Sequence, residues 1–271
     1  MGLFMGVALR DLLDGEDIFI KDLCGKVLVV DAYNNLYQYL SSIRQRDGSL
    51  LVDSKGRVTS HLIGLFNRAT NLMQKGIKLA FVFDGEPPAL KKVERQKRKA
   101  IKVEAEKKYE EAKKKKDIES MKKYATRTSR LSFEMVEDAK KLVRALGLPV
   151  IDAPSEGEAQ AAYIVSKGDA FAAVSQDYDS LLHGAERVIQ NLTITARKKK
   201  PNTLAYEPLN PRIIFLSKSL NKLGIDKEQL IIMAILIGTD YNLGGIKGIG
   251  PKKALDLVKK HGSEFDDLFK D

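Results

Sequence analysis

The sequence predicts an α/β fold of three layers, α/β/α, with helices on both faces of a mostly parallel central sheet. Two short runs, 26–31 and 79–84, are continuously apolar until each ends in an aspartate, as is typical of strands buried on both faces. Between them, residues 59–75 carry apolar side chains at helical spacing, so the three segments form a βαβ unit. Helices and strands continue to alternate, which favours a parallel sheet between two helical layers.

The remaining elements follow from the same periodicities. Thr59 is the expected N-cap of the helix at 59–75, and Gly76 is expected to end that helix. Downstream we expect a helix at 133–146, a strand at 149–151, a helix at 156–167, a strand at 170–175, and two helices at 211–223 and 226–237.

The composition narrows the class of protein. With 271 residues, 44% of them hydrophobic, the chain can bury a substantial core. Its first apolar stretch is short and has no basic leader, so we expect an intracellular protein with neither a signal peptide nor a membrane span. The single cysteine, Cys24, excludes an internal disulfide, and only three histidines accompany it, which disfavours a zinc site. Any metal is therefore expected among oxygen ligands.

The segment 89–130 differs from the rest of the chain, and we expect it to be helical. Residues 91–130 contain 17 Lys or Arg and 7 Asp or Glu, which accounts for the whole net charge of +10. With few apolar residues to bury, one interpretation is a pair of solvated charged helices. The alternative is a stripe of cations that faces phosphate, because four of them follow the i, i+4, i+7, i+11 spacing of one helical face: Lys91, Arg95, Arg98 and Lys102.

A glycine-rich hairpin precedes the last expected helix. Gly248 and Gly250 are followed by Pro251, a residue favoured at the first position of a helix. The backbone amides of such a turn and the helix N-terminus can hold a DNA phosphate, as in helix-hairpin-helix DNA-binding elements. An ordinary glycine-rich turn is the other interpretation; Lys252 and Lys253 beside it favour phosphate binding.

Carboxylates follow the expected strands at the edge of the sheet where ligands bind in open α/β folds. The candidates are Asp31, Asp84, Glu156, Glu158, Asp177 and Asp179. Asp177 and Asp179 alternate in a stretch that we expect to be extended, so both would point to one side. Each acid could instead cap a helix or open a loop, with Ser155 and Glu158 matching a capping box. Together, however, converging carboxylates repel one another unless cations neutralise them.

An oxygen-only ligand set suits Mg²⁺ or Mn²⁺. Two such ions roughly 3.5–4 Å apart activate a water and stabilise both the attacking and the leaving oxygen at phosphorus. The basic stripe would complement them, with Lys91 and Arg98 neutralising charge on the scissile phosphate. The residues therefore predict hydrolysis of phosphodiester bonds.

The assembled residues resemble the flap endonucleases, and most of all the archaeal members of that family of 5′ nucleases. The resemblance runs from Met1 to the end of the chain and is most specific at 30–32, 59–62, 82–88, 153–161, 175–181, 238–241 and 245–254. It implies a structure-specific 5′ flap endonuclease that cuts branched or flapped double-stranded DNA with two Mg²⁺ ions, for which Mn²⁺ can substitute. The family acts in Okazaki fragment maturation and in repair, in the nucleoid of archaea or the nucleus of eukaryotes.

The resemblance also implies a division of the chain and of its roles. Residues 1–271 would be one nuclease domain, with an N-terminal part at 1–88, a basic helical arch at 89–130, an internal part at 131–240 and a duplex-binding helix-hairpin-helix region at 241–271. The implied metal ligands are Asp31, Asp84, Glu156, Glu158, Asp177, Asp179 and Asp240, and the implied catalytic basic pair is Lys91 and Arg98. Asp240 rests on the resemblance alone.

Further DNA contacts are implied in the same way. Gly2 would lie where the N-terminus enters the active site, Tyr37 would stack near the scissile nucleotide, and Arg44 and Thr59 would lie near the duplex and the pocket for a 3′ flap. The Gly248 hairpin would grip duplex DNA, in relatives with a bound K⁺.

Two departures from the family pattern stand out. Relatives continue past this point and usually finish with a peptide that docks on the sliding clamp, whereas this chain stops at Asp271, so we interpret it as a truncated or partial chain. Gln190 stands where relatives commonly have an arginine, which weakens one DNA contact.

Two alternatives remain open. A related 5′ exonuclease or bubble endonuclease would share the acids. A catalytically silent DNA-binding protein is disfavoured, because carboxylates that repel phosphate would not help it bind.

Overall fold

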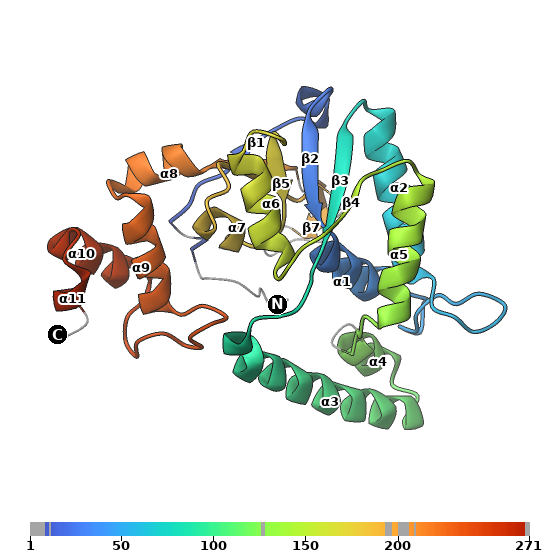
Figure 1. Ribbon diagram of the computed structural model, residues 1–271. Helices are drawn as coiled ribbons and strands as arrows, with labels where there is room; N and C mark the ends of the chain where they lie inside the picture. The colour runs from blue at the N-terminus through green and yellow to red at the C-terminus, as the bar shows by residue number, and fades with distance from the viewer. Residues whose placement is uncertain are drawn as a thin grey trace. The chain divides into compact units, whose positions relative to one another are not determined.

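The protein contains a mixed sheet of seven strands flanked by helices (Figure 1). The computed structural model describes residues 9–10, 12–125, 128–192, 197–199, 206–208 and 210–268. The strands of this sheet are β1 Glu16–Asp17, β2 Val27–Asp31, β3 Lys78–Phe83, β4 Val150–Asp152, β5 Ala172–Val174, β6 Arg187–Gln190 and β9 Arg212–Phe215. Their hydrogen-bonded order is β1–β9–β6–β5–β2–β3–β4, and the pairs β2–β5, β5–β6 and β3–β4 are parallel. The predicted α/β fold with a mostly parallel sheet is confirmed.

The chain divides into two compact units, and each is described by itself. Unit 1 is Met1–Val30 with Glu158–Asp271, and unit 2 is Asp31–Gly157. Among the described residues of both units, none of the helices is long and apolar enough to cross a membrane.

Unit 2 contains the strands β3 and β4 and most of the helices of the N-terminal half. The helices are α1 Ala32–Ser42, α2 Ser60–Gln74, the 3₁₀ turn η2 Ala89–Lys91, α3 Lys92–Lys114, α4 Ile118–Ala125 and α5 Phe133–Ala145. The expected helices at 59–75 and 133–146 are therefore present as α2 and α5. Thr59 occupies the N-cap of α2, but its side chain makes no capping hydrogen bond, whereas Ser132 accepts the N–H of Met135 at the start of α5.

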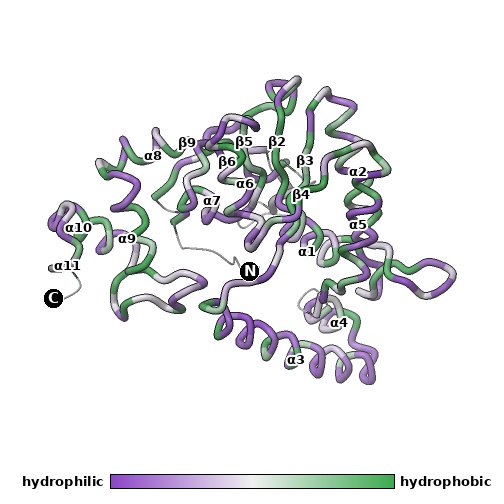
Figure 2. Tube along the Cα trace, viewed as in Figure 1, coloured by the Kyte–Doolittle hydropathy of each residue, from purple (hydrophilic) through white to green (hydrophobic). Residues whose placement is uncertain are grey.

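The described part of the arch segment, residues 89–130, is mostly helical between residues 89 and 125, as the sequence predicts. Its long helix α3 buries only Glu94, Ala105 and Ala112 and is hydrophilic along most of its length (Figure 2). A residue with positive φ, Lys116, ends α3, and the side chain of Asp117 then accepts the N–H of Ser120 in the first turn of α4.

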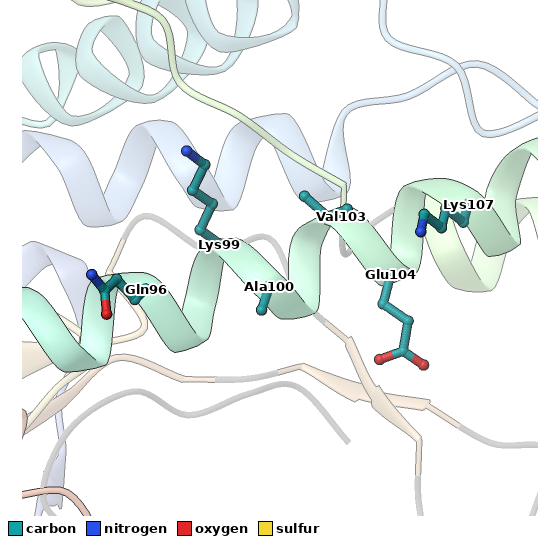
Figure 3. A pocket seen from close by; sticks show the side chains of 6 residues that line it. All are labelled: Gln96, Lys99, Ala100, Val103, Glu104 and Lys107. Atoms are coloured by element: carbon teal, nitrogen blue, oxygen red, sulfur yellow. The ribbon is translucent and has the colours of Figure 1, made fainter.

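One face of α3 carries a shallow, open hollow. Six side chains of this helix border the hollow, which has a volume of about 430 Å³: Gln96, Lys99, Ala100, Val103, Glu104 and Lys107 (Figure 3). At 3.6 residues per turn, these positions lie on a different side of the helix from Arg95, Arg98 and Lys102. The cationic stripe and this hollow are therefore separate surfaces of one helix.

Unit 1 places three parallel strands beside an antiparallel edge. β2, β5 and β6 are parallel neighbours, whereas β9 pairs antiparallel with β6, and β1 with β9. The helices here are η1 Ile20–Leu23, α6 Gly157–Ser166, α7 Asp179–Leu182, α8 Leu216–Leu223, α9 Lys227–Ile237, α10 Pro251–His261 and α11 Phe265–Leu268, and a separate two-stranded sheet joins β7 Arg197–Lys199 to β8 Tyr206–Pro208.

One predicted element is wrong in its first part. A single helix was expected at 211–223, but residues Arg212–Phe215 form the strand β9 and only Leu216–Leu223 form a helix, α8. The cause is the short run Arg-Ile-Ile-Phe, whose apolar residues fit the periodicity of a helix as well as that of a strand. The antiparallel pairing of β9 with β6 makes it a strand.

The C-terminal helices of unit 1 are fastened to each other by a side-chain amide. Asp226 and Gln229 form a capping box at the start of α9, and the Nε2 of Gln229 also donates to the carbonyls of Val258 and Gly262 at the end of α10. The expected helix at 226–237 is thus present as α9, and it holds α10 in place.

Candidate active site

The loops that follow β3 and β4 are interlocked by backbone contacts. The N–H of Gly85 donates to the carbonyl of Ser155 (2.6 Å), and the Oγ of Ser155 donates back to the carbonyl of Glu86 (3.1 Å). A Cβ on Gly85 would lie 2.1 Å from the carbonyl oxygen of Ala153, so no larger residue fits there. Ser155 is therefore engaged in joining the two loops, and the capping box considered from the sequence is not needed to explain it.

The interlocked loops bring two predicted metal ligands together. Asp84 follows β3, and its Oδ1 accepts the N–H of Gly157 at the start of α6 (2.7 Å). Glu156 forms an ion pair with Lys91, and both side chains are largely buried, at 15% and 14% exposure. Asp84, Glu156 and Lys91 therefore form one charged cluster within unit 2.

The electrostatics of this cluster favour a cation. Burial raises the pKa of Asp84; the Gly157 N–H lowers that pKa, the carboxylate of Glu156 raises it again, and Lys91 lowers it. Two buried carboxylates at close range repel each other, and Lys91 alone compensates only part of that charge. The oxygen donors suit a hard divalent ion such as Mg²⁺.

Asp31 ends β2 as the sequence predicts and is 4% exposed. Its Oδ1 accepts the N–H of Asn34 (3.1 Å), so Asp31 is the N-cap of α1. Its backbone carbonyl accepts the side-chain amide of Asn35 (2.7 Å). Asp31 is thus held rigidly at the carboxyl end of a strand.

The other predicted acids lie in unit 1. Glu158 is in the first turn of α6, Asp177 follows β5, and Asp240 follows α9. Asp179 is the first residue of α7, so the expectation of an extended stretch from Asp177 to Asp179 is wrong, because a helical turn begins there; Tyr178 is the N-cap. Within the described part of the chain, no group of three or more His, Cys, Asp or Glu side chains is close enough together to hold a metal ion.

The cationic stripe of α3 is turned toward α1. The ammonium of Lys102 lies 4.5 Å from the centre of the Tyr37 ring, and Arg98 pairs with the buried Glu94. Burial raises the pKa of Tyr37, while Arg98 and then Arg95 oppose that shift. Burial, followed by repulsion from arginines, lowers the pKa of Lys102. These cations therefore share the surroundings of Tyr37.

Arg44 and Thr59 occupy different places in unit 2. The guanidinium of Arg44 donates to the carbonyl of Gly48 (2.8 Å) and to the Oγ of Ser129 (2.7 Å), which ties the 44–58 loop to the end of the arch. Thr59 borders a groove of about 370 Å³ between α2 and α5, together with Leu62, Ile63, Phe66, Asn67, Asp138 and Leu142. Gly2 lies outside the described residues.

The predicted glycine hairpin ends directly at α10. Gly248 has φ +85, and Gly250 is the N-cap, with nothing within 4 Å of a Cβ built there. Pro251 is the first residue of α10, and Lys252 and Lys253 are exposed in its first turn. The hairpin therefore presents a helix N-terminus, open backbone and two ammonium groups on one surface.

The acidic loops lie in regions of the chain that match known nuclease domains. The chain matches the XPG N-terminal domain over residues 5–105 and the XPG I-region over residues 147–240. The fold and site therefore define a nuclease of the XPG type. Flap endonuclease 1 of Staphylothermus marinus is 58% identical over 261 residues, which cover 95% of this chain and 75% of that relative. The chain belongs to the flap endonuclease family, whose members hydrolyse phosphodiester bonds of DNA.

Solved nuclease structures share the fold of this chain. A flap endonuclease-1 structure from Methanococcus jannaschii is 46% identical with a TM-score of 0.75, covering 98% of this chain and 80% of that one. The catalytic core of Rad2 in complex with DNA substrate is 25% identical, with a TM-score of 0.69 over 98% of this chain and 73% of that one. The fold is shared with the Holliday junction-resolving enzyme GEN1 in complex with product DNA and Mg²⁺, which is 21% identical, with a TM-score of 0.61 over 97% of this chain and 55% of that one.

Proposed function

We propose that the flap endonuclease activity of this chain depends on two Mg²⁺ ions bound by carboxylates, and that Asp84 and Glu156 are two of their ligands. The observation that carries the proposal is the interlocked pair of loops, which holds both carboxylates beside Lys91. The further ligands that we propose are Asp31, Glu158, Asp177, Asp179 and Asp240. When bound, the ions would activate a water and stabilise the attacking and leaving oxygens.

The chain's own residues perform the remaining tasks. Gly85 and Ser155 fix the separation of Asp84 from Glu156, so these oxygens need not be reorganised during the reaction. Lys91 is paired with Glu156 in the absence of substrate, which keeps an ammonium group beside the acids and available to a phosphate that carries developing charge. We assign Arg98, about two turns further along the same helical face, to the same phosphate.

DNA is held outside this cluster in the proposal. Arg95, Lys102 and Tyr37 would contact the strand that is cut, and Arg44 and Thr59 the duplex or the 3′ flap. Gly248, Gly250, Lys252 and Lys253 would hold a phosphate of the duplex, with K⁺ at this hairpin as a prediction from the resemblance. The proposed substrate is branched or flapped duplex DNA, and residues 1–271 would act as one nuclease domain.

The test compares cutting of a labelled double-flap substrate with that of single strands and plain duplex, with Mg²⁺ and with excess chelator. Asp84→Asn keeps an oxygen that accepts the Gly157 N–H but removes the charge, so it should fold, bind DNA in Ca²⁺ and fail to cut. Asp169→Ala, an exposed acid at the opposite end of β5, is the control and should cut like the wild type. Cutting by Asp84→Asn at the wild-type rate would remove Asp84 from the site.

A further inference from the structure

Gln190 lies at the end of a strand, beside the strand from which the loop with Asp177 departs. It is the last residue of β6, and the parallel register of β5 with β6 pairs Ala173 with Val188 and Val174 with Ile189. One step further along both strands, Gln190 comes beside Ser175. Both side chains are buried, at 9% and 2% exposure.

The side-chain amide of Gln190 is used within the protein. Its Nε2 donates to the backbone carbonyl of Gln176 (2.9 Å). On the other side of that residue, the N–H of Asp177 donates to the Oγ of Ser175 (3.2 Å). Two hydrogen bonds therefore fix the chain at the point where it turns out of β5, immediately before Asp177 and three residues before Asp179.

This geometry gives Gln190 a different task from that of an arginine at a DNA surface. A neutral, buried amide offers no charge to a phosphate, and contacts to phosphate are what a basic residue would supply. Its donor instead satisfies a carbonyl at the base of a loop that carries two acids. This hydrogen bond is only partly open to water, so removing its donor leaves the Gln176 carbonyl without that partner, which costs stability.

We propose that Gln190 is a positioning residue for the acid loop, residues 175–179, and thereby for the metal affinity of Asp177 and Asp179. The inference rests on the proposed function, in which these two acids are metal ligands. Groups that orient metal ligands from behind typically change metal affinity or activity by about 10–100-fold when they are lost. We expect a loss of metal affinity in the same range when Gln190 loses its donor.

The informative variant is Gln190→Met, which has a similar length but no N–H donor. Single-turnover cleavage at saturating DNA should require at least about tenfold more Mg²⁺ for its half-maximal rate. A titration of Mn²⁺ against the protein without DNA should show a similar loss of affinity. DNA affinity in Ca²⁺ and its dependence on salt should remain those of the wild type. Gln190→Arg, which brings back a donor, should recover most of the metal affinity.

Gln229→Met is the matched control. Gln229 also donates its amide to backbone carbonyls, those of Val258 and Gly262, but at the end of α10 rather than beside the acids. The control should lower thermal stability while the Mg²⁺ concentration for half-maximal cleavage stays at the wild-type value. A shift of that concentration in both variants would mean that Gln190 has only a general structural role, and would overturn the proposal.

Other outcomes are equally decisive. Gln190→Met with wild-type Mg²⁺ dependence but weaker DNA binding would make Gln190 a DNA contact and overturn the proposal. If Gln190→Met does not fold, the second variant is Gln190→Asn, which keeps the amide on a shorter side chain. Gln190→Asn should still raise the Mg²⁺ requirement, and a wild-type requirement would refute the inference. Asp177→Asn tests the metal role of Asp177 separately from the role of Gln190. Normal cutting by Asp177→Asn would remove Asp177 from the metal site. If Asp177→Asn is inactive but Gln190→Met has the wild-type Mg²⁺ requirement, only the role of Gln190 is refuted.

Discussion

Replacing Lys91 by alanine should slow the chemical step far more than it weakens DNA binding. Lys91 and its partner Glu156 are only 14% and 15% exposed, so solvent screens their charges weakly. Two unit charges about 4 Å apart interact by roughly 4 kcal/mol where the effective dielectric constant is about 20. Loss of one preorganised donor in other enzymes costs roughly 10²–10³ in rate, which corresponds to a similar free energy. We therefore expect Lys91→Ala to slow single-turnover cleavage by about two to three orders of magnitude.

The assay is single-turnover cutting of a double-flap substrate at saturating enzyme, alongside DNA affinity measured in Ca²⁺. Lys91→Arg, which keeps the charge, should recover part of the rate. Lys102→Ala is the internal control, because Lys102 lies over the ring of Tyr37 and its loss should alter affinity more than rate. If Lys91→Ala and Lys102→Ala both weaken binding and both retain the wild-type saturating rate, the catalytic role of Lys91 is wrong.

Three further predictions follow from local geometry. Gly85→Ala should abolish cutting and lower the melting temperature, because its Cβ would meet the Ala153 carbonyl at 2.1 Å; normal activity and stability would show that the loops can separate harmlessly. Lys252→Ala and Lys253→Ala should each reduce the salt dependence of duplex binding by about one counterion, with little change in the saturating cleavage rate; an unchanged slope argues against phosphate contacts there. Burial lowers the pKa of His61 below 6.5, so the folded protein favours the neutral ring and should lose stability as pH falls below about 6.5, by at most about 1.4 kcal/mol per pH unit. Urea unfolding of His61→Gln between pH 5 and 7.5 should show a smaller loss, and an identical pH dependence would assign the effect to other groups.

The sequence predicts the strands β2 and β3 well because each is a short apolar run with an aspartate at its end. The parallel strand β6 Arg187–Gln190 was not predicted. The segments 26–31 and 79–84 correspond to β2 and β3, and Gly147 ends the α5 region at a positive φ, as a glycine stop should. The helix α1 was not predicted, because its asparagine, glutamine and serine residues give a weak apolar pattern. The helix forms nonetheless, with Asp31 capping it and Leu36 and Leu40 buried.

The site is less predictable than the strands that carry it. That acids follow β3 and β4 is visible in the sequence, but the hydrogen bonds of Ser155 with Gly85 and Glu86 join two loops that are far apart in the sequence. The phosphate role of Lys91 stays a prediction, and its ion pair with Glu156 is a contact that helical periodicity cannot reveal. The sequence alone suggested that Gln190 weakens a DNA contact, and only the structure reveals its hydrogen bond to the Gln176 carbonyl on the acid loop.

The joined loops after β3 and β4 also limit how the carboxylates of Asp84 and Glu156 can reduce their mutual repulsion. Flexible carboxylates relieve repulsion by moving apart, but Asp84 and Glu156 sit on loops fastened to each other at Gly85 and Ser155. Only a proton, the ammonium of Lys91 or an arriving cation can reduce that repulsion. If Asp84 and Glu156 bind the ions as proposed, the joined loops keep both carboxylates in place when an ion departs, so that the next ion meets the same arrangement.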